Sequence, residues 1–308
     1  MKQPDKISEL IKKEAKSLGF SECVILPAMF LEEEKNHLNN WLKKGLYGEM
    51  TYMARNNDKR LDPRLFFENV KSLILVTQNY FTKDFQKMPD APVVSKYTFG
   101  TDYHFVIKKK LKKLLSYIQN EIHLCKGRSF TDSAPILERA WARRAGLGWV
   151  GKNSNLISTH YGSFFFIGEL LVDVELPYDK TEQIEDHCGS CTRCIDACPT
   201  KAIIADRVVD ARKCISYQTI ERKNGPEETY RGKLANRLFG CDICQDVCPW
   251  NRMNEPHNEP DFNPDPRLLM MTRKEWLNLS EAQFNELFKR SAVQRRGYDG
   301  IKKNLEFL

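Results

Sequence analysis

Apolar residues recur at helical spacing in several parts of the chain. In residues 5–19 they fall on one face, which predicts an amphipathic helix, and a second helix is predicted over about residues 34–45. A longer helix is predicted from Asp102 to about His123, with lysines on its other faces. Its apolar positions are Ile107, Leu111, Leu114, Leu115 and Ile118. Each of these helices is expected to turn one face toward a core.

Shorter stretches carry the pattern of strands. Ser72–Thr77 is a largely apolar run, which is typical of a buried strand. Asn155–Ser158 and Ser163–Val174 are also predicted strands, and the second is rich in Phe and β-branched residues. Ile136–Ala145 is predicted to be a helix that stops at the following glycine, a natural residue for a helix end. This mixture predicts an α+β core.

Acidic and turn-forming residues from about 178 to 187 predict a boundary after this core. A cysteine-rich segment runs to about residue 250, and a Pro-, Asn- and Asp-rich linker covers 255–266. Helices are predicted near 273–290 and 298–307. We therefore predict a core over residues 1–180, a ferredoxin-like domain over 181–255 and a C-terminal helical segment over 256–308.

Composition and charge limit the cellular locations and the kinds of partner that are expected for this protein. The 308 residues are 41% hydrophobic, which is ordinary for a globular protein, and no apolar run approaches the roughly 18 residues needed to span a bilayer. Met1 to Asp5 carries neither a secretory nor a twin-arginine signal, so we expect a cytoplasmic protein without a membrane partner. The 48 Lys and Arg exceed the 41 Asp and Glu. This excess is compatible with a nucleic-acid partner, but it is more typical of a solvated basic surface.

Eight of the ten cysteines fall into a two-cluster ferredoxin pattern. The first run is Cys-x2-Cys-x2-Cys-x3-Cys-Pro, and the second, Cys-x2-Cys-x3-Cys-Pro, lacks one thiolate. In such ferredoxins the first three cysteines of a run hold one cluster and the fourth crosses to the other. The pattern predicts one 4Fe-4S cluster on Cys188, Cys191, Cys194 and Cys248. It predicts a second on Cys198, Cys214, Cys241 and Cys244, with Cys214 replacing the missing thiolate.

Other interpretations of these cysteines and of a nearby glycine motif are weaker. CxxC pairs also bind structural zinc, but zinc ribbons lack the CxxCxxCxxxCP run. Cys23 and Cys125 lie outside the pattern in apolar company and are predicted to be inert packing residues. Gly146-x-Gly148-x-x-Gly151 matches the dinucleotide fingerprint, but a helix precedes it and a strand follows, which reverses the required order. These glycines are predicted to form a tight helix-to-strand turn.

Several segments between about residues 50 and 251 carry a joint resemblance to one known family. They are Lys96-Tyr97, Asp102-Tyr103-His104, Asp132-Ser133-Ala134-Pro135, Glu138-Arg139-x-x-Ala142-x-x-Ala145-Gly146-Leu147-Gly148, Gly151-Lys152-Asn153, His187-Cys188-Gly189-Ser190-Cys191, Arg212-Lys213-Cys214-Ile215-Ser216-Tyr217 and Gly240-Cys241-Asp242-x-Cys244-Gln245-x-Val247-Cys248-Pro249-Trp250-Asn251. Together they resemble the epoxyqueuosine reductases, cobalamin-dependent iron–sulfur enzymes of queuosine biosynthesis.

The resemblance implies a cobalamin-binding core similar to B12-processing and reductive dehalogenase domains, followed by the ferredoxin-like module. The implied reaction reduces the epoxide of epoxyqueuosine, at the wobble position of a tRNA anticodon, to queuosine and water. Asp132 matches the family's proton donor, and a pKa raised beside a buried cofactor would keep it protonated. Taken alone, an aspartate after a strand is more typical of a helix cap.

The resemblance also implies positions near the corrin of a base-off cobalamin. They are Arg60, Tyr97, Asp132, Asn153, Ser154 and Ser216. The common base-off motif D-x-H-x-x-G is nearly present, but Ile107 stands in place of its glycine. His104 is therefore predicted to line or cap the site rather than to ligate cobalt.

Many relatives continue into a helical-repeat domain that helps to grip tRNA, whereas this sequence stops at Leu308. The candidates for tRNA contact are Arg222 and Lys223, with the Lys108–Lys113 helix and the basic C-terminal residues beside them. Each basic cluster alone is more typical of a solvated face. The expected partners are tRNA bearing epoxyqueuosine and an unidentified electron donor, and we expect a monomer.

The expected electron path enters at the cluster of Cys198, Cys214, Cys241 and Cys244 and passes to the cluster of Cys188, Cys191, Cys194 and Cys248, which reduces cobalt. Three rival functions use the same features. A reductive dehalogenase would share both cofactors but usually carries an export signal. A ferredoxin-type carrier would leave the first 180 residues without a purpose. A tRNA-binding module would bind tRNA without turnover.

Overall fold

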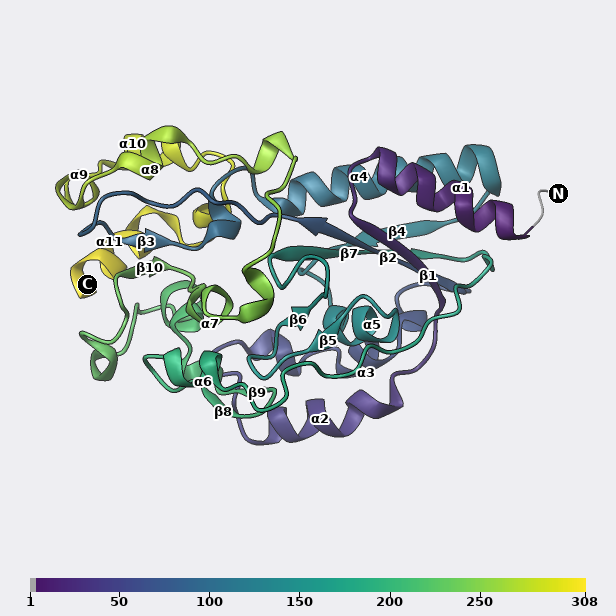
Figure 1. The fold of residues 1–308 in the computed structure, drawn as a ribbon, viewed down its shortest axis with the longest axis horizontal. Coiled ribbons are helices and arrows are strands. Elements are labelled where there is room, and N and C mark those ends of the chain that lie inside the picture. Colours follow the sequence, from purple (N-terminus) through teal and green to yellow (C-terminus); the bar gives the residue numbers. More distant parts are fainter. Residues whose placement is uncertain (1–3) are drawn as a thin grey trace.

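The computed structural model describes residues 4–308, and an antiparallel sheet of four strands lies at the centre of one half of the molecule (Figure 1). In sheet order the strands are β1 (Glu22–Pro27), β2 (Ser72–Asn79), β7 (Phe165–Val172) and β4 (Gly127–Phe130). The strands predicted at 72–77 and 163–174 are confirmed as β2 and β7. The pattern did not predict β1 or β4, and the four residues of β4 are too few for an alternation to be recognised.

Helices cover both faces of this sheet (Figure 1). On one face lie α1 (Pro4–Ser17) and α4 (Tyr103–Tyr117), and on the other lie α2 (Glu32–Lys43), α3 (Asn57–Leu61) and α5 (Glu138–Arg144). Side chains of β7 alternate between the two cores, as they do in any strand, so Leu170 packs under α4 and Leu171 under α5. The helices predicted near 5–19 and 34–45 are confirmed as α1 and α2.

Two further predicted helices are confirmed with refined ends. Asp102 caps α4, because its carboxylate accepts the backbone N–H of His104 at 2.9 Å. Beyond Tyr117 the helix continues in wider turns as far as Ile122. The helix predicted over 136–145 is α5, and Gly146 follows it with φ +69°, a conformation that glycine adopts without strain.

The cysteine-rich segment forms a module of short elements. They are α6 (Arg193–Ala197), β8 (Ile203–Ala205), β9 (Val208–Val209) and α7 (Ile243–Asp246). Helices α6 and α7 pack against each other and bring the two cysteine runs together. The hairpin of β5 (Trp149–Val150) and β6 (Leu156–Ile157) joins this module to α5, since Trp149 and Ile157 pack against Cys248. Helix α5 ends at Arg144 and β5 begins at Trp149, so the predicted helix-to-strand turn at 146–151 is confirmed.

The C-terminal segment shares a third core with earlier residues. Strand β10 (Arg237–Phe239) pairs in parallel with β3 (Val93–Val94). Packed around them are α8 (Pro266–Met270), α9 (Arg273–Leu277), α10 (Glu281–Leu287) and α11 (Gly297–Phe307) (Figure 1). The helix predicted near 273–290 is two helices, because Thr272 and Ser280 each begin one with a capping box. The three-part division stays a prediction, since all three predicted parts contribute to this core.

The predicted linker over 255–266 packs onto α4, where Phe262 is buried and Glu259 pairs with Lys110. Within residues 4–308, no helix is both long enough and apolar enough to cross a bilayer. Residues 1–3, on which part of the export-signal prediction rests, lie outside the described residues.

Candidate active site and cluster ligands

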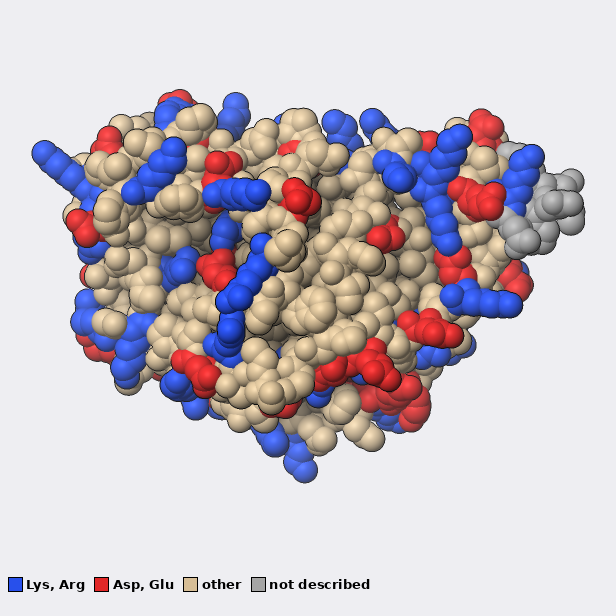
Figure 2. Space-filling model, viewed as in Figure 1, with Lys and Arg blue, Asp and Glu red and all other residues tan. Residues whose placement is uncertain are grey.

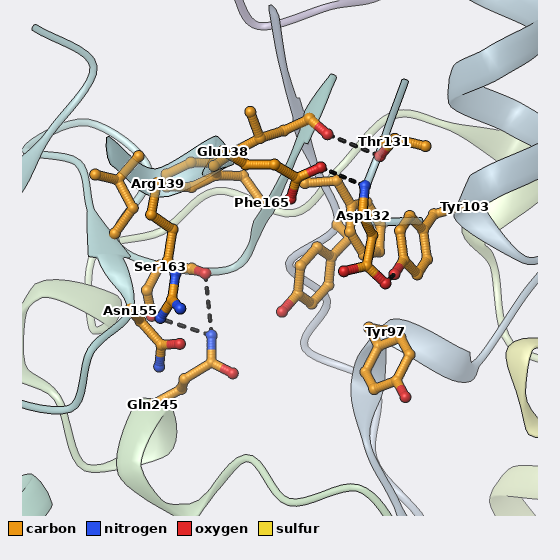
Figure 3. A pocket seen from close by; sticks show the side chains of 14 residues that line it. Tyr97, Tyr103, Thr131, Asp132, Glu138, Arg139, Asn155, Ser163, Phe165 and Gln245 are labelled. Carbon is orange, nitrogen blue, oxygen red and sulfur yellow. Dashed lines mark hydrogen bonds between the residues drawn. The ribbon is translucent and has the colours of Figure 1, made fainter. Parts of the chain in front are cut away.

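A cavity of about 260 Å³ lies between the central sheet and the cysteine module (Figure 3). Aromatic side chains form much of its lining, namely Tyr80, Tyr97, Tyr103, Phe165 and Phe166. The charged groups among the lining residues are Asp132, Glu138 and Arg139. A largely aromatic wall with a few convergent polar groups is typical of a site for an organic ligand.

Asp132 follows β4 and lines this cavity. Its backbone has φ +53°, a left-handed conformation that aspartate tolerates better than most residues, and 51% of its side chain is exposed. The carboxylate accepts a hydrogen bond from the Tyr103 hydroxyl at 2.7 Å. The alternative in which Asp132 caps a helix is wrong, because the next helix, α5, begins only at Glu138.

His104 connects Asp132 to a second carboxylate. Its Nδ1 lies 2.7 Å from Oδ1 of Asp102, and its Nε2 lies 3.5 Å from Oδ2 of Asp132. Burial alone would lower the pKa of His104, but the hydrogen bonds and negative charges of the two aspartates outweigh it and raise the pKa to about 9. This pKa favours a protonated imidazole at neutral pH. His104 is not among the residues that line the cavity, and it reaches the cavity only through Asp132.

The pKa of Asp132 differs from the expectation. Burial alone would raise it, but hydrogen bonds from His104 and Tyr103, together with the charge of His104, hold the pKa below its ordinary value. The expected raised pKa of this carboxyl is therefore wrong. The proton of the pair resides on His104, and Asp132 lies between that proton and the cavity.

Glu138 and Arg139 line the same cavity, although no role was expected for either residue from the sequence. The Glu138 carboxylate accepts the backbone N–H of Asp132, and Arg139 donates to the carbonyl of Ser154 (Figure 3 shows the first contact). Burial and the negative charge of Asp132 raise the pKa of Glu138 to about 8. Both residues belong to the segment that carries the family resemblance, and this is the only signal in the sequence that points to them.

The eight cysteines of the pattern lie near one another. Besides burial, the charges of Cys188 and Cys248 raise the pKa of Cys194, and those of Cys188 and Cys191 raise the pKa of Cys248. Cys198, Cys214, Cys241 and Cys244 influence one another in the same way. Within residues 4–308 no three His, Cys, Asp or Glu side chains are arranged to hold a metal ion, so the two ligand sets stay a prediction.

One cysteine of the second group lies beside the cavity. Asn155 and Gln245 line the cavity, and the Asn155 Nδ2 atom lies 4.0 Å from the Cys244 sulfur. In the other group, Cys191 is flanked by exposed residues at positions 189, 190, 192 and 193. The position of Cys244 favours an electron order that is the reverse of the expected one.

The other residues expected near a corrin are spread around the cavity. Tyr97 lines it, and Asn153 and Ser154 lie in the adjoining turn, where Asn153 donates to the carbonyl of Cys244 at 3.3 Å. Arg60 and Ser216 are not among the lining residues. Arg60 is buried and donates to the carbonyl of Tyr52 at 2.9 Å, and Ser216 lies in the cysteine module, where it hydrogen-bonds to the Cys214 thiol.

The two tRNA candidates differ in their surroundings. The side chain of Arg222 is only 22% exposed and makes contacts within the protein. It pairs with Glu227 at 3.3 Å and donates a hydrogen bond to the carbonyl of Gly225 at 2.6 Å. Lys223 is exposed. Figure 2 shows lysine and arginine side chains mixed with acidic ones over the face in view, so that face carries no continuous basic stripe.

The two remaining cysteines have the predicted character. Cys125 is buried, and burial raises its pKa to about 11. Burial raises the pKa of Cys23 to about 12. Neither thiol is a reactive thiolate at neutral pH.

Comparison with known proteins identifies the two halves of the site. Residues 187–251 match the family model described as "4Fe-4S double cluster binding domain", and residues 60–133 match the one described as "Epoxyqueuosine reductase QueG, DUF1730". The first match supports iron–sulfur clusters over zinc and confirms the ferredoxin-like module. Together with the α+β core and its cavity, it defines the protein as an iron–sulfur oxidoreductase.

Relatives that match over the whole chain identify the family more specifically. The epoxyqueuosine reductase of Cellulophaga algicola is 52% identical over 308 residues, which cover 100% of both chains. A crystal structure of epoxyqueuosine reductase with an epoxyqueuosine-modified tRNA stem loop is 30% identical, with a TM-score of 0.89 over 99% of this chain and 81% of that one. The chain belongs to the epoxyqueuosine reductase family. A catabolic reductive dehalogenase shares the fold at 16% identity, with a TM-score of 0.51 over 99% of this chain and 38% of its own.

Proposed function

We propose that this chain reduces epoxyqueuosine to queuosine at the wobble position of tRNA, with cobalamin in the cavity and two 4Fe-4S clusters as the electron path. The observation that carries this proposal is the position of Asp132, which is open to the cavity on one side and bonded to Tyr103 and His104 on the other. The Cys244 sulfur lies beside the same cavity. An acid and an electron source thus converge on one space.

The residues around the cavity fit an organic macrocycle better than a bare metal ion. Planar aromatic side chains offer apolar contact, and Tyr97 and Asp132 are the predicted corrin neighbours that reach the cavity. Asn153 and Ser154 lie in the turn beside them. When bound, cobalamin supplies a cobalt centre that can be reduced to a strongly nucleophilic state. Both ring nitrogens of His104 face carboxylates, so His104 is not proposed as a cobalt ligand. The base-off form is proposed on the family resemblance.

Asp132 and His104 work as one proton-donating pair. At neutral pH the pair holds a single proton, which resides on His104. As negative charge develops on the departing oxygen, Asp132 receives the proton of His104 and passes it on to that oxygen. The Tyr103 hydroxyl fixes the orientation of the carboxylate at 2.7 Å.

The clusters and the surface complete the proposal. Electrons from an unidentified donor enter at the cluster of Cys188, Cys191, Cys194 and Cys248 and continue to the cluster of Cys198, Cys214, Cys241 and Cys244. The partner is tRNA, contacted by Lys223 and less directly by Arg222. We further propose that the protein acts as a monomer in the cytoplasm.

His104→Gln tests the proton pair. Because the pKa of His104 is about 9, the wild-type kcat/KM should fall as pH rises through about 9, where the imidazole loses its proton. The variant should lose about 10²-fold in kcat/KM at pH 7 and should no longer show this fall. Anaerobic rate measurements across pH 6–10 check it, with the exposed His123→Gln as the matched control. An unchanged fall in the variant would contradict the role of His104.

A further inference from the structure

A buried glutamate lies behind the cavity wall. Glu169 stands in the middle of β7, on the face that packs under α5, and its side chain is 0% exposed. Its strand neighbours are Leu75 on β2 and Phe130 on β4, so its surroundings are apolar. Neither carboxyl oxygen finds a hydrogen-bond donor within residues 4–308. An ionised carboxylate is strongly disfavoured in such a place, and Glu169 therefore holds a proton.

Glu138 is the group that connects Glu169 to the cavity. Glu138 is the first residue of α5, which packs on β7. Burial and the charges of Glu138 and Asp132 raise the pKa of Glu169 well above its ordinary value. Two neighbouring carboxyl groups of this kind are strongly disfavoured as a pair of anions, so at least one of them holds a proton. The other charged groups that face Glu138 are Asp132 after β4, Arg139 on α5 and His104 on α4. Glu138 itself lines the cavity beside Asp132 (Figure 3).

The reduction needs more protons than the Asp132–His104 pair holds. Conversion of the epoxide to an alkene breaks both C–O bonds, forms the C=C bond and releases the oxygen as water. It consumes two protons and two electrons, and both electrons come from an external one-electron reductant by way of the clusters. The pair supplies one of these protons, and Glu138 is a further titratable group that lines the cavity.

We propose that Glu138 is the second acid of the active site and that Glu169 is a positioning residue that shares and replenishes its proton. The inference rests on the proposed function, because both acids are assigned to the same departing oxygen. The second acid involves other residues than the Asp132–His104 pair of the proposed function. Glu138 lies on α5 and Glu169 on β7, whereas Asp132 and His104 lie on the loop after β4 and on α4.

Kinetics with Glu138→Gln provide the first test. Glutamine still accepts the Asp132 N–H, so the loop is held while the acid is lost. In the wild type, kcat/KM should fall as pH rises through about 8, where Glu138 ionises, before the separate fall near pH 9. Glu138→Gln should lose the fall near pH 8 and reduce kcat about 10²-fold, and Glu169→Gln should reduce kcat about tenfold. The exposed Glu175→Gln is the control.

Infrared spectroscopy tests the shared proton without substrate or cofactor turnover. At pH 7 the wild type should show the carbonyl stretch of a buried protonated carboxyl that shifts in D2O. Glu169→Gln should lose the part of this absorption that belongs to Glu169, Glu138→Gln should lose the part that belongs to Glu138, and Asp132→Asn and Glu175→Gln should keep both. The native state also keeps a proton that the unfolded state releases above the ordinary pKa of 4.5, so stability should fall as pH rises from there toward about 8. Glu169→Gln should flatten that fall in Tm.

The outcomes separate this inference from the proposed function. If the wild type reduces epoxyqueuosine but both variants keep full kcat and the fall near pH 8, the second acid is overturned and the function stands. If the wild type has no turnover, the proposed function fails, and the infrared band alone decides whether the pair holds a proton. Absence of the band from the wild type overturns the inference in either case.

Discussion

Replacement of Asp132 by asparagine should reduce turnover of epoxyqueuosine by about 10²- to 10⁴-fold, the range by which a positioned proton donor accelerates a reaction. Asparagine has nearly the same shape and is among the few residues that adopt the left-handed conformation found here, φ +53°. The loop should therefore keep its conformation. What is lost is the group that stands between the proton on His104 and the cavity.

The measurement is the single-turnover rate with excess enzyme, cobalamin and reductant. Asp90→Asn is a suitable control, because Asp90 is exposed and far from the cavity lining. Iron content and affinity for the modified tRNA should match the wild type in both variants. Full turnover by Asp132→Asn, with normal cobalamin content, would remove Asp132 from the mechanism.

Replacement of Cys214 by serine should remove one cluster and stop turnover. Cys214 stands alone between the two cysteine runs, and it completes the second group only because the fold brings it to Cys198 and Cys241. Backbone N–H groups of Ser216 and Tyr217 bond to its sulfur and favour the thiolate form. Iron should fall from about eight to about four atoms per chain, and the remaining cluster should be the one on the Cys188 group.

Iron and sulfide analysis with electron paramagnetic resonance of the reduced protein checks this result. Cys23→Ser is the matched control, because Cys23 lies outside both groups and its thiol is protonated at neutral pH. It should retain both clusters and turnover. If Cys214→Ser kept about eight iron atoms per chain, the assignment of the second cluster would be wrong.

The cysteine spacing predicts which residues form the two groups, and it carries no information on which group lies at the cavity. Ligand spacing is a local property, since CxxCxxC can wrap one cluster whatever surrounds it. Which group lies at the cavity depends on how the module docks on the sheet, and Asn155 and Gln245 mediate that contact. Gln245 is marked only by the segment that carries the family resemblance, and no sequence pattern points to Asn155.

The charge state of Asp132 also could not be predicted from the sequence. Its partners Tyr103 and His104 lie on α4, 29 and 28 positions earlier, and Glu138 reaches it from α5. Periodicity predicted both helices but not which of their polar residues face each other. Glu169 shows the same limit. The apolar run around it predicts the strand β7, but the sequence does not show that both of its carboxyl oxygens lack a hydrogen-bond partner among residues 4–308.

The decisive measurement is the fate of the modified nucleoside. The purified protein is incubated anaerobically with cobalamin, a one-electron reductant and tRNA that bears epoxyqueuosine, and the digested nucleosides are analysed by mass spectrometry. Conversion to queuosine, lost when cobalamin is omitted and in Asp132→Asn, is the expected result. Unchanged epoxyqueuosine in the presence of both intact clusters and bound cobalamin would contradict the proposed function.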